Sequence, residues 1–130
     1  MASIYKEILI DTRAEDVWAA VRDVGAVHRR LVPGIVVDAR LDADARVVTF
    51  ANGMVVRELI VAVDDQTCRH SWSARGEPLT HHNASIQVFS DGPDKCRIVW
   101  IADLMPNEAA EAVGEMIDEA LATMKQTLEY

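Results

Sequence analysis

The spacing of apolar residues changes along the chain, from strand-like runs to a helical period. Residues Ser3–Ile10 are rich in β-branched and apolar side chains, which is typical of a strand. From Ile35 onward, short apolar runs are separated by turn residues at intervals of about ten residues. After Pro106, apolar residues recur with the period of a helix. The sequence therefore predicts an α+β fold with most of its strands in the middle of the chain.

The middle of the chain predicts six consecutive strands joined by short turns. Asn52-Gly53 lies between two apolar runs and predicts a hairpin with a two-residue turn, because this pair tolerates the positive φ angles of a type I′ turn. Asp65-Gln66 predicts a second two-residue turn. The six expected strands are Ile35–Leu41, Arg46–Ala51, Met54–Val63, Thr67–Arg75, His81–Ser90 and Cys96–Leu104.

Two short helices are expected between the first strand and these six. Thr12 and Glu15 have the spacing of a capping box, in which each side chain accepts a hydrogen bond from the other residue's backbone amide. The helix that follows would turn Val17, Val21 and Val24 inward. A second short helix is expected over 27–31, before Pro33-Gly34 ends it.

A long C-terminal helix is expected from Asn107, as its cap, to about Leu128. It would span roughly 30 Å, which is enough to cross a small sheet. Its acidic residues lie mostly away from one apolar stripe, so the sheet must cover that stripe. The stripe comprises Ala110, Val113, Ile117, Ala120, Leu121, Met124 and Leu128.

Alternation of side chains along each strand indicates which face of the sheet packs against this helix. In the strand over 67–75 the alternate residues Arg69, Ser71, Ser73 and Arg75 are all polar and are expected to face outward. The expected two-residue turns at Asp65-Gln66 and Asn52-Gly53 fix the register of the preceding strands relative to this one. They place Val55 opposite Phe50 on the inner face. The inward polar and aromatic residues predicted in this way are Arg57, His70, Trp72, His82 and Trp100.

Three of these inward residues, Arg57, His70 and His82, are polar. Their presence on one inner face favours a cavity over a solid core, because a buried charge or imidazole needs a partner. Arg57 is then a candidate for binding an anionic group of a ligand. A slip of one residue would instead turn Glu58 inward, as a candidate general base. His70 and His82 are candidates for proton transfer or for simple hydrogen bonding, and Trp72 and Trp100 for stacking on a ligand or for core packing.

The order of elements, together with the segments NGMVVRELIVAVDD, HHNASIQVF and RIVWIADLMPNE, resembles the START-related, birch-pollen-allergen-like (SRPBCC) superfamily in its polyketide cyclase/dehydrase branch. The resemblance covers nearly the whole chain. It implies a helix-grip fold, in which a curved antiparallel sheet of about seven strands surrounds the long C-terminal helix. The superfamily includes ligand carriers, cyclases, hydrolases and adaptors, so the resemblance specifies the fold more closely than the chemistry.

Composition narrows the expected partners. A net charge of −8 disfavours nucleic acid and anionic membranes, which attract clustered Lys and Arg. We expect a single cytoplasmic domain over 1–130, since no targeting sequence or membrane span is evident. Cys68 and Cys96 are expected to be free thiols. No cofactor is expected, and no metal site, because neighbouring strand residues such as His81 and His82 point to opposite faces.

Three functions follow as hypotheses. The first is binding of a hydrophobic or aromatic small molecule between the sheet and the C-terminal helix. The second is a cyclase or dehydratase, in which His70 or His82 moves a proton and Arg57 stabilises an enolate. The third is a protein-interaction adaptor or a homodimer, formed through apolar residues of the outer sheet face. Those outer residues are predicted to be Val56, Ile60, Val99 and Ile101.

Overall fold

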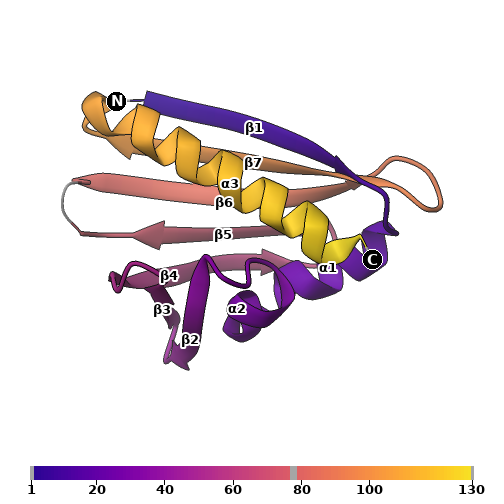
Figure 1. Cartoon of the computed structure of the whole chain (residues 1–130), viewed down its shortest axis with the longest axis horizontal. Coiled ribbons are helices and arrows are strands. Elements are labelled where there is room, and N and C mark those ends of the chain that lie inside the picture. The colour runs from indigo at the N-terminus through magenta and orange to yellow at the C-terminus, as the bar shows by residue number, and fades with distance from the viewer. Residues whose placement is uncertain (1, 77–78, 130) are drawn as a thin grey trace.

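The computed structural model describes residues 2–76 and 79–129. In this part of the chain seven strands form one antiparallel sheet, in the order β1-β7-β6-β5-β4-β3-β2. Figure 1 shows the long C-terminal helix lying across it. The strands are β1 (Ala2–Ile10), β2 (Val36–Asp42), β3 (Ala45–Phe50), β4 (Val55–Asp64), β5 (Arg69–Ala74), β6 (His81–Ser90) and β7 (Cys96–Met105).

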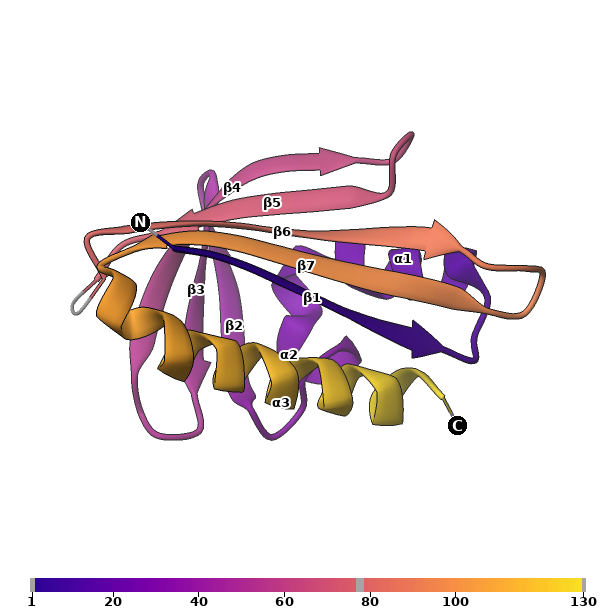
Figure 2. The ribbon, with the colours of Figure 1, turned by 90° about the horizontal axis from the view of Figure 1, so that it is seen from above.

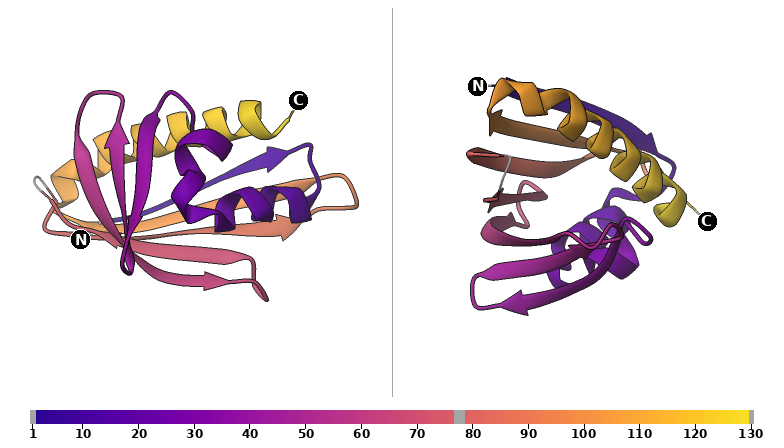
Figure 3. Two further views of the ribbon diagram at one scale, coloured as in Figure 1. Left: turned by 90° about the horizontal axis from the view of Figure 1, so that it is seen from below. Right: turned by 60° about the vertical axis from the view of Figure 1, so that its left-hand side comes forward.

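All three α-helices lie on the same, concave side of the curved sheet (Figure 3). They are α1 (Ala14–Arg22), α2 (Val27–Arg30) and α3 (Ala110–Leu128), with short 3-10 turns at Val24–Ala26 and Asn107–Ala109. Strands β2 and β3 run steeply across the direction of β5–β7 and reach the side of α3 (Figure 2). This arrangement is the predicted helix-grip fold. Among the described residues, no helix combines the length and the apolar character needed to span a bilayer.

The apolar stripe of α3 forms the centre of the core, as its spacing predicts. Ile117, Ala120, Leu121 and Met124 are buried and pack in one cluster with residues of the sheet, such as Ile98, that have no exposed surface. Full burial of an aliphatic side chain stabilises a fold by about 1.5–3 kcal/mol. This packing therefore couples the stability of α3 to that of the sheet.

Hydrogen bonds fix the C-terminal end of α3 to the end of β1. The Thr12 hydroxyl donates to the Leu128 carbonyl (2.8 Å), and Lys125 Nζ donates to the Leu9 carbonyl (2.7 Å). The Asp11 amide donates to a carboxylate oxygen of Glu129 (2.7 Å). The predicted capping box is wrong, since no side chain caps α1 and the Thr12 hydroxyl is engaged with α3. No side chain caps the start of α3 either, contrary to the role expected of Asn107.

The sheet register differs from the prediction at the β3–β4 turn. Thr49, rather than Phe50, lies opposite Val55. The Phe50 amide bonds to the Met54 carbonyl, so three residues rather than two form the turn, with Gly53 at φ +90°. One extra residue in a turn reverses the facing of every side chain on the following strand. As a result Val56 and Glu58 face inward, and Arg57 faces outward.

The β4–β5 connection also differs, but a bulge of one residue in β4 offsets the one-residue change at the β3–β4 turn before the chain reaches β5. Asp64 pairs with Arg69 across a four-residue turn, in which Cys68 has a φ of +53°. A bulge between Ile60 and Ala62 then shifts the register by one residue. His70 lies opposite Val63 instead of Val61, and yet it faces inward as predicted.

The outer-face prediction is wrong for Val56 and Ile60, which share the inward face of β4 with Glu58. Val99 is buried, and Ile101 is exposed as expected. The outward apolar residues of β4 are instead Val55, Leu59 and Val61. A homodimer through this face stays a prediction. Both cysteines are free thiols, as predicted.

Candidate functional site

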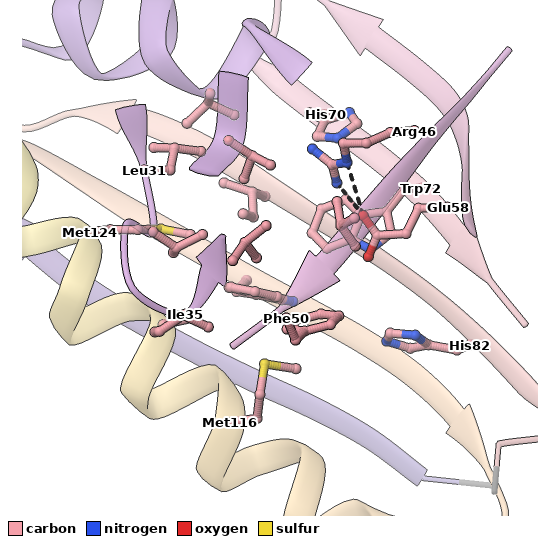
Figure 4. Close-up of a pocket in the computed structure, with 18 residues that line it drawn as sticks. Leu31, Ile35, Arg46, Phe50, Glu58, His70, Trp72, His82, Met116 and Met124 are labelled. Carbon is pink, nitrogen blue, oxygen red and sulfur yellow. Dashed lines mark hydrogen bonds and ion pairs between the residues drawn. The ribbon is translucent and has the colours of Figure 1, made fainter. Parts of the chain in front are cut away.

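A chamber of about 70 Å³ lies between the concave face of the sheet and the helices (Figure 4). Its walls are mostly apolar and come from nearly every element. Polar and aromatic side chains gather on the sheet side, and the helices contribute aliphatic side chains and methionines. The lining includes Arg46, Glu58, His70, Trp72, His82, Ile86 and Trp100 from the strands, Val21, Val27, Met116, Ala120 and Met124 from the helices, and Leu31 directly after α2.

A larger cavity of about 810 Å³ adjoins the chamber at the first half of α3. It lies between α3, the β3–β4 turn and the end of β5, and its lining is also mostly apolar. The two cavities share Phe50, Glu58, His82 and Met116, which form the boundary between them. Figure 4 shows Phe50 and Met116 on opposite sides of this boundary, from the sheet and from the helix.

Four of the five residues predicted to face the cavity do so, namely His70, Trp72, His82 and Trp100. The prediction for Arg57 is wrong. Its side chain is 48% exposed and pairs with Asp42 on the outer face of the sheet. The three-residue β3–β4 turn is the cause, since it rotates Arg57 out and Glu58 in. The anion-binding role expected of Arg57 therefore loses its basis.

The chamber contains an ion pair between Arg46 and Glu58, and Arg46 was not among the residues predicted to face inward. Arg46 and Glu58 lie directly opposite each other on β3 and β4. Nε and Nη2 of Arg46 donate to the same Glu58 oxygen at 2.9 and 2.6 Å, and Nη1 donates to the Val24 carbonyl at 3.3 Å. The side chains are only 6% and 12% exposed. The inward position of Arg46 could have been predicted from the alternation of side chains along its strand. Residues 46 and 50 share a face, and Phe50 was predicted to face inward.

This ion pair decides the role of Glu58. The sequence offers an inward Glu58 as a candidate general base, and the carboxylate does enter the cavity. However, one of its oxygens accepts two hydrogen bonds from a buried guanidinium, so this oxygen is already engaged within the protein. The Arg46 guanidinium also lies 5.8 Å above the Trp72 ring. The pair brings no net charge into the chamber, and neither ion is left alone for a charged ligand.

The position of His70 depends on the bulge in β4. The bulge directs the Ala62 carbonyl to Nδ1 of His70, at 3.1 Å, and the ring stacks on Trp72 with 5.0 Å between centroids. Burial lowers the pKa of His70 from 6.5 to about 4, and the nearby charge of Arg46 acts in the same direction. The imidazole is therefore neutral at pH 7. Its Nε2 has no hydrogen-bond partner among the residues that the structure describes.

Two further aromatic groups complete the sheet side of the site. Trp100 packs edge-on against Trp72, with 5.6 Å between centroids, and its buried Nε1 has no partner within residues 2–76 and 79–129. His82 lies at the boundary with the outer cavity, and burial lowers its pKa. Within the described ranges, no group of three or more His, Cys, Asp or Glu side chains is arranged to hold a metal ion.

Comparison with protein families gives one match that covers nearly the whole chain. Residues 1–129 match the family described as "Polyketide cyclase / dehydrase and lipid transport". This match confirms the resemblance expected from the sequence. A comparison with curated proteins found no match.

Solved structures share the fold at low sequence identity. A START superfamily protein from Mycobacterium smegmatis is 11% identical, with 97% of this chain and 96% of that chain covered, and a TM-score of 0.82. Norcoclaurine synthase from Thalictrum flavum, in complex with dopamine and hydroxybenzaldehyde, is 19% identical, with 98% and 83% covered and a TM-score of 0.74. The di-domain ARO/CYC BexL, from the BE-7585A biosynthetic pathway, is 17% identical, with 98% and 46% covered and a TM-score of 0.85. At these identities the likeness shows the fold alone.

The buried ion pair generates a stability prediction. Arg46→Met leaves the Glu58 carboxylate buried without its partner, so we expect the free energy of unfolding to fall by about 3–5 kcal/mol. The matched control is Arg57→Met, which breaks an exposed pair on the outer face and should cost less than about 1 kcal/mol. Urea unfolding followed by circular dichroism measures both. Equal losses in the two variants would contradict the assignment of Arg46 to the interior.

The lowered pKa of His70 generates a pH prediction. Below pH 6.5 the unfolded chain takes up a proton at this residue, whereas the folded protein resists protonation down to about pH 4. The stability contributed by neutral His70 is therefore present above pH 6.5 and decreases as the pH falls toward 4. By pH 5 this loss should reach about 2 kcal/mol.

His70→Phe tests that dependence, because phenylalanine keeps a ring in the chamber but cannot titrate. Urea-unfolding curves at about pH 7, 6 and 5 should show a shallower decline for the variant than for the wild type. Some decline should remain in the variant, since the pKa of His82 is lowered as well. Identical slopes for the two proteins would show that His70 does not titrate as a buried group.

Proposed function

The chain belongs to the polyketide cyclase / dehydrase and lipid transport family, and we propose that it binds a hydrophobic or aromatic small molecule between the sheet and α3. The carrying observation is the pair of adjoining cavities, of about 70 and 810 Å³, on the concave face. Ligand pockets are typically about 300–1,000 Å³, mostly apolar, with a few placed polar groups. The outer cavity lies within this range, and the chamber supplies the polar groups.

The chemistry of the lining favours a flat, apolar ligand. Trp72 and Trp100 present aromatic surface, and Met116 and Met124 provide adaptable walls from α3. Apolar area removed from water contributes roughly 25 cal/mol per Å², so such walls give affinity without any charge. The norcoclaurine synthase structure, which has the same fold, holds two aromatic molecules, dopamine and hydroxybenzaldehyde. This parallel supports an aromatic ligand for the present chain.

The expected partners follow from the same features. A net charge of −8 favours a small molecule over nucleic acid or an anionic membrane surface. We expect the protein to act in the cytoplasm, which cell fractionation with a specific antibody can test.

Filling the outer cavity tests the proposed function. Val113 lines this cavity from α3, and Val113→Trp should block it, whereas Ala122→Trp places the same side chain on the exposed face of the helix. Native mass spectrometry and thermal-shift assays with aromatic polyketides, lipids and hormone-like acids would identify a ligand. Its affinity should fall at least tenfold in Val113→Trp and stay unchanged in Ala122→Trp. Equal affinity in both variants would place the ligand elsewhere.

A second candidate function is a cyclase or dehydratase reaction in the same cavity. One observation favours it: the Ala62 carbonyl orients His70, which lines the chamber and whose Nε2 has no partner among the described residues. A pKa of about 4 makes this imidazole a weak base at neutral pH. Arg57 cannot stabilise an enolate here, since it lies on the outer face. Ligand binding is therefore the better-supported function.

Substitution of the histidines tests this second candidate. If the protein converts a poly-β-keto substrate, His70→Ala should lower kcat by roughly 10²–10⁴, which is the usual contribution of a general base. Product formation by mass spectrometry measures the effect, with His81→Ala as a control on the neighbouring outward position of β6. Unchanged turnover in both His70→Ala and His82→Ala would remove proton transfer by these residues.

A further inference from the structure

Two buried polar atoms in the chamber remain unpaired once the Arg46–Glu58 pair is accounted for. They are Nε2 of His70 and Nε1 of Trp100, and neither has a hydrogen-bond partner in the described part of the chain. The two residues are only 2% and 7% exposed. Buried polar atoms nearly always have a partner, so both atoms point to a group that enters the chamber.

These two atoms have complementary hydrogen-bonding chemistry. The Ala62 carbonyl can only accept a hydrogen bond, so Nδ1 of His70 carries the proton. In a neutral imidazole Nε2 is then an acceptor, and burial keeps His70 neutral at pH 7. The indole N–H of Trp100 can only donate. Between them, these two buried atoms therefore offer one acceptor and one donor.

The sheet register places this acceptor and this donor on either side of one residue. His70 lies opposite Ile86 on β6, and Ile86 lies opposite Trp100 on β7. All three side chains line the same chamber. The imidazole and the indole therefore belong to residues that flank Ile86 on the two neighbouring strands.

The charged residues that line the chamber limit which polar groups a ligand can place there. Arg46 and Glu58 neutralise each other, and Arg46 also donates to the Val24 carbonyl. A carboxylate would enter an apolar space without a free cation, which is costly. A group without polar atoms would leave both nitrogens unpaired. A hydroxyl both donates and accepts, and it carries no charge.

We propose that the chamber selects ligands with a neutral hydroxyl on a planar ring, which donates to Nε2 of His70 and accepts from Nε1 of Trp100. This inference rests on the proposed binding function and adds the chemical class of the ligand. The chamber, at about 70 Å³, has room for the hydroxyl-bearing end. The rest of the ligand lies beyond Phe50 and Met116, in the cavity of about 810 Å³.

Three matched probes test the selectivity of the wild-type protein at pH 7: 2-naphthol, naphthalene and 2-naphthoate. We expect 2-naphthol to bind at least about tenfold more tightly than either of the others, because only it pairs both nitrogens without a charge. Isothermal titration calorimetry gives the dissociation constants. Equal affinity for naphthol and naphthalene would overturn the hydroxyl inference and leave the proposed function standing. Absence of binding by all three would overturn both.

Variants with the hydrogen-bonding atoms removed test which residues supply the selectivity. His70→Phe and Trp100→Phe should each reduce the naphthol-to-naphthalene preference several-fold, with naphthalene affinity little changed. The matched control for the indole is Trp18→Phe, since Trp18 Nε1 already donates to Asp65 and does not line the chamber. The control for the imidazole is His81→Phe, at the neighbouring, outward position of β6.

Circular dichroism melting curves would verify that each variant is folded. If a phenylalanine variant does not fold, His70→Gln tests the same atom with a polar side chain. Two outcomes would overturn the assignment of the donor and the acceptor. One is that both His70→Phe and Trp100→Phe keep the preference for naphthol over naphthalene, and the other is that the control variants lose this preference equally.

Discussion

The concave face of the sheet is governed by one constraint, which is that each polar group turned toward the core must find a partner. Arg46 and Glu58 satisfy it through each other, and the Val24 carbonyl takes a further donor of Arg46. His70 satisfies it on one side through the Ala62 carbonyl, which the bulge in β4 makes available. Loss of either partner would leave a charge or a carbonyl buried alone, which costs more than the interaction itself contributes.

The long helix is held at its C-terminal end and near its middle. Thr12 and Lys125 bond its C-terminal end to the first strand and the turn that follows it, and Lys6 pairs with Asp118 nearer its middle (3.2 Å). The larger cavity lies on the N-terminal side of these contacts, where Val113 and Met116 of the helix line it. Ala120 leaves room over the chamber. Gly114 does not contribute to that space, since a Cβ there would lie 4.0 Å from Lys6 on β1.

The elements could be predicted from the sequence because each has a strong local pattern. The period of α3 and the turn signals near Asn52 and Asp65 identify the helix and the strand boundaries to within a few residues. The family match also follows from this order. On β5, polarity alone predicted the facing of His70 and Trp72, since each alternate residue is polar.

The candidate site could be predicted only in part, because register depends on turn length rather than on composition. Asn-Gly is compatible with a two-residue turn and with the three-residue turn that forms, and the difference of one residue exchanges Arg57 for Glu58. The bulge in β4 has no Gly or Pro to mark it. The Arg46–Glu58 pair arises from two strands meeting in one register, and a single strand pattern cannot show it.

An interior that contains ions and yet has no net charge distinguishes ligands by shape and hydrogen bonding. A free arginine in the cavity would have favoured anions, and a free carboxylate would have favoured cations or proton transfer. With both neutralised, affinity for the proposed ligand would come from apolar burial, and its orientation from the neutral imidazole and the indole N–H. An imidazole whose pKa is lowered to about 4 holds a hydroxyl proton by hydrogen bonding more readily than it removes it. The same burial that makes His70 a good acceptor therefore makes it a poor base, which favours binding over catalysis at this site.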